Sequence, residues 1–402
     1  MTGSRASEEL AGKPWVIVAG DFHRQGGMDR ANAELATYLV EQKIPVHLVG
    51  HRVDRALAEH PLVATHPVPR PGGVHLFNDW FLESFGRRVA ERVTSEWPGA
   101  RVLVNGGNCC WADLNWVHCV HHAWPCVDHD APNWFKLKNR LAKASARRRE
   151  HRALRTARLV IANSERTRRD LLDHLRLDEN QVKRVYLGID STCHSVTERE
   201  RRAARDWLKV PESVPVIVFV GALGYDQNKG LDTLWSAWQQ LCLQRDWDAR
   251  LIVAGGGRAV ERWRVRIAQT GLSGQIQMLG FSDRIGDLLA AADLLVSPVR
   301  YEAYGLNVQE AVCRGVSALV SSQAGVAEHY SSELREMLLS DPEDADELAS
   351  RLWSWRARID FWKDCFRPLG QKLRNHTWSR MAEQIMTLAE EHPRSPINNP
   401  AP

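Results

Sequence analysis

Short apolar runs that alternate with amphipathic stretches constrain the fold of this chain more than any other feature of its sequence. Runs of this kind, rich in Val, Ile and Leu without strict alternation, are typical of parallel strands buried on both faces. Residues such as Ala31, Leu35 and Leu39, and the apolar positions of Lys229–Cys242, recur with helical spacing between the runs. The runs are Trp15–Gly20, Val46–Gly50, Val102–Asn105, Trp116–His121, Leu159–Ala162, Val182–Leu187, Val216–Gly221, Leu251–Ala254, Ile276–Leu279, Leu294–Ser297 and Ala318–Ser321.

The runs form two blocks, and 402 residues suit two domains. Strand–helix alternation in each block predicts an α/β fold with two doubly wound parallel sheets. The polar stretch Asp190–Arg205 separates the blocks. We therefore predict a first domain over 14–190, a second over 191–375, and disordered polar tails at 1–13 and 393–402.

Composition excludes several classes of protein. Hydrophobic residues make up 44% and charged residues 25%, which is ordinary for a globular chain, and a net charge of +4 gives no indication of nucleic-acid binding. No apolar run approaches 18 residues, and Met1–Pro14 is too polar for a secretory signal. The eight cysteines contain no C-x2-C pair, so we expect reduced thiols and a cytoplasmic location.

Two glutamates around a glycine form the most informative local pattern. Glu302 lies in the loop after the run Leu294–Ser297, and Glu310 follows eight residues later in a helix expected to begin near Gly305. The start of a helix presents free N–H groups and positive potential, which suits phosphate, and Glu310 could accept hydrogen bonds from sugar hydroxyls. The alternative is a loop carboxylate followed by a solvated helix face.

This pattern resembles the E-x7-E signature of the family-4 retaining glycosyltransferases. The resemblance covers roughly residues 14–390 in the family's order. The further segments that carry it are Phe219–Leu223, Asn228–Leu234, Leu251–Gly257, Leu288–Pro298, Ser321–Glu328, Leu159–Leu171, Gly188–Asp190 and Asn375–Glu383.

The resemblance implies the GT-B fold, in which two Rossmann-like domains face each other across a cleft and a C-terminal helix, here 376–392, crosses back to the first domain. It implies a retaining, metal-independent glycosyltransferase that needs no cofactor and moves a sugar from a nucleotide-sugar donor to a carbohydrate, lipid-linked or small-molecule acceptor. Glu302 matches the residue that faces the transferred sugar. The donor-binding positions that the family pattern implies are Gly27, Lys229, Tyr304, Gly305, Leu306 and Glu310.

The segment Trp116–His129 is dense in His and Cys and first suggests zinc. Its spacing argues against a metal site, because His118 and His121 differ by three and would lie on opposite faces of a strand. The family has a cleft histidine at the position of His121, which implies a catalytic role in positioning sugar or acceptor. The alternative is a polar residue at the end of a strand. His118 is predicted to be a hydrogen-bonded interior histidine.

Aromatic and basic residues suggest the acceptor side. Among 16 tryptophans, most are predicted to be core, whereas Trp111, Trp116, Trp124 and Trp134 lie where a ring could stack on an acceptor sugar or meet lipid. Ten basic residues between 136 and 158 are opposed only by Glu150. The run is either a solvated helix face or, with Trp134, a peripheral contact with an anionic membrane surface.

The sequence departs from the family pattern in places, and other functions remain as alternatives to sugar transfer. Ala222 stands where the family commonly has an arginine, which leaves the diphosphate one cation short unless Arg300 or Arg258 supplies it. No glycine loop has the G-x-G-x-x-G pattern, so a nicotinamide enzyme is not expected. A nucleotide-sugar epimerase, a phosphorylase and a non-catalytic sugar-binding scaffold remain alternatives. The sequence does not indicate the base, the sugar or the acceptor.

Overall fold

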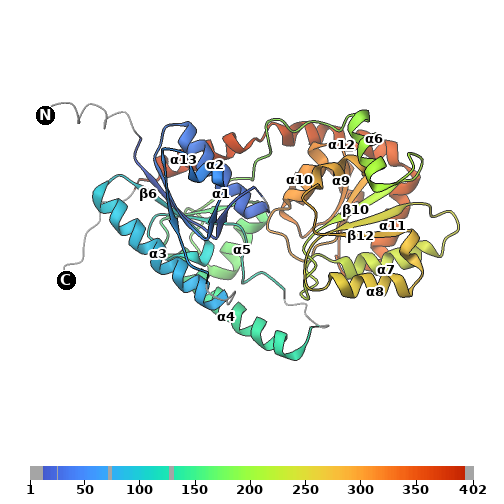
Figure 1. The fold of residues 1–402 in the computed structure, drawn as a ribbon, viewed down its shortest axis with the longest axis horizontal. Helices are drawn as coiled ribbons and strands as arrows, with labels where there is room; N and C mark the ends of the chain where they lie inside the picture. The colour runs from blue at the N-terminus through green and yellow to red at the C-terminus, as the bar shows by residue number, and fades with distance from the viewer. Residues whose placement is uncertain (1–11, 25, 71–74, 126–130, 394–402) are drawn as a thin grey trace. The chain divides into compact units, whose positions relative to one another are not determined.

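The computed structural model describes residues 12–24, 26–70, 75–125 and 131–393. The described chain folds into two α/β units, each a parallel sheet with helices packed around it (Figure 1). Unit 1 comprises residues 1–123, 137–188 and 377–402, and unit 2 comprises residues 124–136 and 189–376.

Unit 1 is built on a seven-stranded sheet in the order β5-β3-β1-β6-β7-β8-β9. Every pairing in this sheet is parallel. Strands β1, β7 and β8 are buried along their whole length, and β6 is buried except at Arg101. Strands β2 and β4 of this unit form a separate, short parallel pair. The elements are β1 (Trp15–Val18), β2 (Asp21–Phe22), α1 (Gly27–Glu41), β3 (Val46–Gly50), β4 (Arg52–Val53), α2 (Arg55–Ala58), β5 (Val63–Pro67), α3 (His75–Glu96), β6 (Arg101–Asn105), β7 (Leu114–Val117), α4 (Asn133–Thr156), β8 (Leu159–Ala162), α5 (Glu165–Leu175), β9 (Val182–Arg184) and α13 (Trp378–Glu391).

Unit 2 contains a six-stranded parallel sheet in the order β12-β11-β10-β13-β14-β15. In chain order this is 3-2-1-4-5-6, so the direction of winding reverses between β10 and β13. Ligands of such sheets bind at this reversal, outside the carboxyl ends of the strands. The elements are α6 (Glu198–Leu208), β10 (Val216–Val220), α7 (Leu231–Cys242), β11 (Arg250–Ala254), α8 (Val260–Gln269), β12 (Ile276–Gly280), α9 (Ile285–Ala291), β13 (Leu294–Ser297), α10 (Leu306–Cys313), β14 (Ser317–Ser321), β15 (Leu338–Leu339), α11 (Ala345–Ala357) and α12 (Ile359–Arg374).

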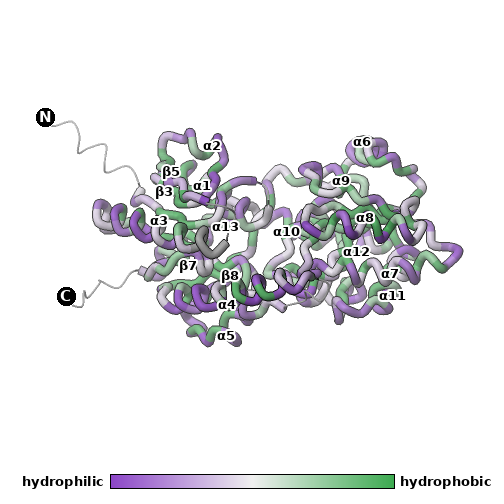
Figure 2. The backbone as a smooth tube through the Cα atoms, turned by 60° about the horizontal axis from the view of Figure 1, so that its bottom comes forward, coloured by the Kyte–Doolittle hydropathy of each residue, from purple (hydrophilic) through white to green (hydrophobic). Residues whose placement is uncertain are grey.

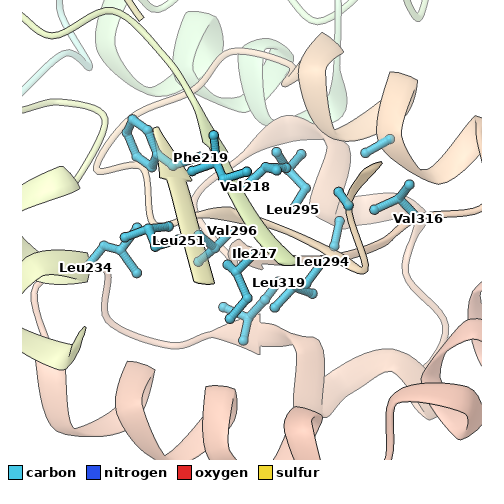
Figure 3. Packing of buried hydrophobic residues seen from close by; sticks show 14 of the residues in the cluster. Ile217, Val218, Phe219, Leu234, Leu251, Leu294, Leu295, Val296, Val316 and Leu319 are labelled. Carbon is cyan, nitrogen blue, oxygen red and sulfur yellow. The ribbon is translucent and has the colours of Figure 1, made fainter. Parts of the chain in front are cut away.

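The core of unit 2 lies between its sheet and the helices. Figure 3 shows aliphatic side chains of β10, β13 and β14 packed with Leu234 of α7. Trp235, Trp238, Trp355 and Trp362 are buried in the same core. Along the helices of both units the tube of Figure 2 alternates between hydrophilic and hydrophobic colour, as expected for helices with one face on a sheet.

The apolar runs of the sequence correspond to strands of the two sheets, but the observed strands differ from the predicted ones in two ways. The run predicted as a strand over Trp116–His121 was placed wrongly, because β7 ends at Val117 and both His118 and His121 follow it. The argument that these histidines lie on opposite faces of a strand therefore does not apply. The edge strand β5 was missed because it is half exposed and carries no apolar run.

The division into units differs from the predicted domains in one segment. The predicted tails lie largely outside the described residues. Residues 124–136 were predicted within the first domain, whereas the described residues among them, 124, 125 and 131–136, group with unit 2. Apart from residues 12, 13 and 393, the predicted tails lie outside the described residues. Among the helices of the described chain, none is both long and apolar enough to cross a membrane.

Candidate functional site

Two loops at the reversal of the unit 2 sheet bring Lys229 and Glu302 together. Lys229 follows β10 and Glu302 follows β13, the two strands on either side of the reversal. The Lys229 Nζ donates a hydrogen bond to Glu302 Oε2 at 2.5 Å, and the side chains are 28% and 23% exposed. The sequence placed both residues in the donor site, and the structure shows them as an ion pair that a ligand can still reach.

Asn228 fixes the register of the two loops. Its side-chain amide donates to the Tyr301 carbonyl at 2.9 Å and accepts from the Tyr301 N–H at 3.0 Å. The Arg300 N–H in turn donates to the Asn228 carbonyl at 2.9 Å. Gly230, with a φ of 73°, then starts α7 so close to β13 that a Cβ there would lie 1.9 Å from the Pro298 carbonyl oxygen. Sequence reasoning missed Asn228, although its side chain positions the residues on both sides of the ion pair.

The helix expected near Gly305 is present as α10. Gly305 is its N-cap with a φ of 111°, a conformation that favours glycine, and Leu306 is its first helical residue. The first N–H groups of a helix have no partner within it, so they are available to an anion. Tyr304 is buried, and its carbonyl accepts a hydrogen bond from Val326. Glu310 is half-buried in the second turn of α10.

Arg300 does not replace the cation missing at Ala222. Its guanidinium donates to both carboxylate oxygens of Asp232, at 2.9 and 2.7 Å, and to Glu343 at 2.8 Å. The side chain is only 8% exposed. Two carboxylates therefore hold this arginine as a structural clamp between the loop after β13 and α7.

In unit 1, a glycine pair begins the first helix. Gly26 has a φ of 89° and is the N-cap of α1, and both Gly26 and Gly27 are exposed. Exposed backbone at a helix start allows a ligand to approach closely. The structure therefore places Gly27 at the first position of α1, directly after the loop between the first strand and helix, rather than in that loop.

His121 is held by a carboxylate that the sequence analysis did not assign to the site. The His121 Nδ1 and backbone N–H both donate to Glu150 Oε1, at 3.0 and 2.9 Å, and the His122 Nδ1 donates to Glu150 Oε2 at 2.8 Å. Burial raises the pKa of the Glu150 carboxyl, but hydrogen bonds and charge interactions with His121 and His122 outweigh it and hold the pKa below its usual value. With Nδ1 turned to Glu150, Nε2 is the ring nitrogen that His121 can offer to a substrate.

His118 is an interior residue, as predicted, but it is not hydrogen-bonded. Among the described residues neither ring nitrogen has a partner. Its ring lies 4.3 Å from that of Trp116 between centroids. Burial lowers the pKa of His118 to about 3, so the ring is neutral at physiological pH.

The four tryptophans proposed for the acceptor side have different surroundings. Trp116 is fully buried in β7, so its predicted place beside the acceptor is wrong. Trp111 is partly buried against the core of unit 1. Trp124 packs on Tyr301 of unit 2 with ring centroids 5.6 Å apart, so it lies beside the loop that carries Glu302. Trp134 is 59% exposed near the start of α4. Trp124 therefore contacts the loop that carries Glu302, through Tyr301 and within one unit.

One cluster in the described chain has ligand atoms close enough to hold a metal. The carboxylates of Asp21 and Asp29 and the ring of His23 offer atoms within 4.8 Å of one another. Burial raises the pKa of Asp29 to about 6. Arg52 and Arg70 each lie 3.8 Å from Asp21, so its charge is already partly neutralised by the protein.

Two family models match the chain one after the other. The model described as Glycosyltransferase Family 4 matches residues 25–193, and the model described as glycosyl transferases group 1 matches residues 200–356. The chain belongs to the family-4 glycosyltransferases. The matches cover most of both units, and the sequence-based assignment to this family is confirmed.

Curated relatives of this glycosyltransferase match over part of their length. An uncharacterised glycosyltransferase of Methanocaldococcus jannaschii is 28% identical over 47% of this chain and 48% of its own. A D-inositol 3-phosphate glycosyltransferase of Corynebacterium efficiens is 27% identical over 64% and 62%. A GDP-mannose-dependent monoacylated α-(1-6)-phosphatidylinositol monomannoside mannosyltransferase of Corynebacterium glutamicum is 29% identical over 49% and 53%. The chain thus spans about half the length of the curated relatives it matches.

Solved structures show the fold. Sucrose-phosphate synthase from Thermosynechococcus elongatus superposes with a TM-score of 0.73 at 18% identity, covering 94% of this chain and 98% of its own. Anabaena HepE in complex with UDP-glucose superposes with a TM-score of 0.68 at 17% identity, covering 94% and 99%. The predicted fold class, GT-B with two Rossmann-like domains, is confirmed.

Proposed function

We propose that this protein transfers a sugar from a nucleoside-diphosphate sugar to an acceptor hydroxyl, with retention of anomeric configuration and without a metal. The observation that carries the proposal is the convergence of Lys229 and Glu302 at the reversal of the unit 2 sheet, where Glu302 belongs to the loop that leads into α10. A cation, a carboxylate and a helix N-terminus in one place suit a diphosphate joined to a hydroxylated sugar.

Each group has a role in this proposal. The diphosphate displaces Glu302 as the partner of Lys229, and Lys229 together with the N–H groups at the start of α10 neutralises the charge that develops on the leaving group. Glu302, once released, faces the hydroxyls of the transferred sugar. Glu310 accepts hydrogen bonds from the ribose. Because protein groups supply the positive charge, no metal or cofactor is required, and the leaving phosphate takes the acceptor proton.

The acceptor is proposed to meet unit 1, with His121 as its catalytic contact. Glu150 holds the His121 ring so that Nε2 can receive a hydrogen bond from an acceptor or sugar hydroxyl. The names of two relatives include inositol phosphate and a phosphatidylinositol mannoside. These names favour a polyhydroxylated or lipid-linked acceptor.

Nucleotide binding tests the donor site directly. Lys229→Ala and Glu310→Ala each remove a charge-assisted contact, which is worth about 1.5–3 kcal/mol, so each should weaken nucleotide affinity by more than about tenfold. Isothermal titration with UDP and GDP measures this, since relatives are named with UDP-glucose and GDP-mannose. Lys372→Ala, an exposed lysine of α12, is the matched control.

Unchanged UDP and GDP affinity in both variants would exclude the proposed site. Turnover then separates the remaining functions. A transferase releases nucleoside diphosphate from a panel of nucleotide sugars and does so faster when an acceptor is added. An epimerase converts the nucleotide sugar without an acceptor, and a scaffold binds without turnover.

A further inference from the structure

A basic pocket lies at the opposite end of α10 from the proposed donor site. It has a volume of about 270 Å³ and is formed by the segment before α6, the C-terminal end of α10 and one face of α12. At roughly 30 Å³ per water molecule, this space is larger than a phosphate ion and approaches the size of a sugar phosphate. All of its walls belong to unit 2.

The lining of this pocket is dominated by cations. Glu198 is the one acidic residue among the lining side chains, which include five basic ones: Arg201, Arg314, Lys363, Arg367 and Arg374. Three of the five come from α12 with the spacing 363, 367 and 374, which places them on one side of the helix. Gly370 completes that side, and a Cβ there would lie 2.6 Å from the Val312 carbonyl oxygen. Its lack of a side chain lets α12 pack closely on α10.

The acidic groups nearby are shared among several cations. Asp293 accepts from Arg201 and from the buried Arg205, both at 2.7 Å, and lies 3.4 Å from Lys363. Glu212 lies 3.8 Å from both arginines. Arg367 donates to Asp364 at 2.5 Å, and Lys363 also lies 3.9 Å from Asp360. Arg374 differs from them, because it donates to two neutral oxygens, those of the Cys313 carbonyl and the Ser195 hydroxyl.

Arg314 is the least satisfied of the lining cations. Its Nε is buried and has no hydrogen-bond partner in the described chain. The carboxylate paired with it, that of Glu200, is 3.8 Å away, beyond hydrogen-bond distance. An anion in the pocket would give this guanidinium the acceptors it lacks, since a planar fork of N–H donors matches phosphate well.

We propose that this pocket binds a phosphate dianion, either free or as the phosphate group of a small phosphomonoester. The site is distinct from the donor site: the eight residues of α10 separate them by about 12 Å at 1.5 Å per residue. The proposal does not depend on sugar transfer. At this C-terminal end of α10 the helix dipole favours cations, and the Arg314 N–H donates to the Glu310 carbonyl at 3.1 Å.

The test measures binding of inorganic phosphate and of glucose 6-phosphate to the full chain carrying Lys229→Ala, which disables the donor site. Isothermal titration should show saturable binding of at least one of the two. Adding Lys363→Gln and Arg367→Gln should weaken that binding at least tenfold. These side chains are 38% and 68% exposed, so the substitutions should not disturb folding. Arg245→Gln with Arg335→Gln, two exposed arginines of unit 2, is the charge-matched control.

Tighter binding of glucose 6-phosphate than of phosphate identifies a phosphomonoester site, and equal binding identifies a phosphate site. Arg314→Lys keeps the charge but loses the fork, and it should also weaken binding while the thermal midpoint stays near that of the parent. The proposal is overturned if neither probe binds, or if the Lys363/Arg367 variant binds as tightly as its control. Loss of all binding in Lys229→Ala alone would overturn it too, while supporting the donor site.

Discussion

Glu150 shows how one residue can determine the geometry of a proposed catalytic side chain. It is fully buried, yet its carboxylate accepts hydrogen bonds from both His121 and His122 and remains charged because its pKa lies below the usual value. An Arg147 Nε–H also donates to the His121 carbonyl at 3.0 Å, which fixes the backbone. The only acid in a basic stretch is therefore the anchor of the histidine that we assign to the acceptor side.

Glu150→Gln tests this positioning role. Glutamine keeps the shape but loses the charge and turns a donor toward one histidine, so we expect the transfer rate to fall at least tenfold. UDP affinity should stay within about twofold, because Lys229, Glu310 and the start of α10, which are proposed to hold the nucleoside diphosphate, belong to unit 2. Steady-state kinetics and nucleotide titration measure the two effects. Glu179→Gln, at a glutamate whose side chain is 75% exposed, is the control. An unchanged rate would show that Glu150 is only structural.

The same variant has a predicted dependence on pH. The folded pKa of Glu150 is below 4.5, so its carboxylate stabilises the fold at pH values above 4.5 and this contribution is lost as the pH falls through the folded pKa. Relative to the wild type, Glu150→Gln should lose about 1–3 kcal/mol of unfolding free energy at pH 7. Urea unfolding at pH 7 and at pH 4 should show this deficit shrinking at the lower pH.

At the scale of elements, the donor site depends on two loops joined by one side chain. Asn228→Ala would remove two buried hydrogen bonds, those of the Asn228 side chain with the Tyr301 N–H and carbonyl, at a cost of about 2 kcal/mol. It should also weaken UDP binding, because Lys229 and Glu302 then lose their common register. Urea unfolding and titration measure both. Gln240→Ala removes an exposed amide bonded to Asp346 and should change neither. Full UDP affinity in Asn228→Ala would contradict the positioning role.

The sequence predicted strands and helices better than it predicted contacts between side chains. Each apolar run of unit 2 became a strand, because burial on both faces leaves a strong signal in composition. The start of α10 was predicted because glycine with positive φ is a local requirement. The pairing of Lys229 with Glu302, and of Asn228 with Tyr301, joins residues 73 apart. Such pairs follow from sheet order, which local patterns do not encode. The same holds for Glu150 and His121, where the helical pattern gave no reason to expect a fully buried acid.

At the scale of the whole molecule, the numerous tryptophans and the run of basic residues lie in different parts of the structure. Most of the described tryptophans serve as core, and those of unit 2 pack in pairs such as Trp238 with Trp247, whose ring centroids lie 5.4 Å apart. The basic residues instead concentrate on α4, where Trp134, Leu137 and Leu141 are also 59–62% exposed. Their spacing of three and four residues places these apolar side chains on one side of the helix. Exposed apolar residues beside cations are typical of helices that lie on anionic membranes.

Membrane contact through α4 is the last prediction. A surface lysine or arginine near anionic lipid contributes about 1 kcal/mol, so replacing Lys138, Arg140 and Arg148 with glutamine should reduce binding at least tenfold. Flotation with phosphatidylglycerol vesicles should show this loss, and with phosphatidylcholine vesicles little binding is expected from any variant. Leu137→Ser with Leu141→Ser should weaken binding as well, because these exposed side chains enter the interface. Glutamines at Arg199, Arg202 and Lys209, three exposed cations of unit 2, remove the same charge elsewhere. If that control loses as much binding as the α4 variant, the attraction depends on net charge and α4 is not the contact.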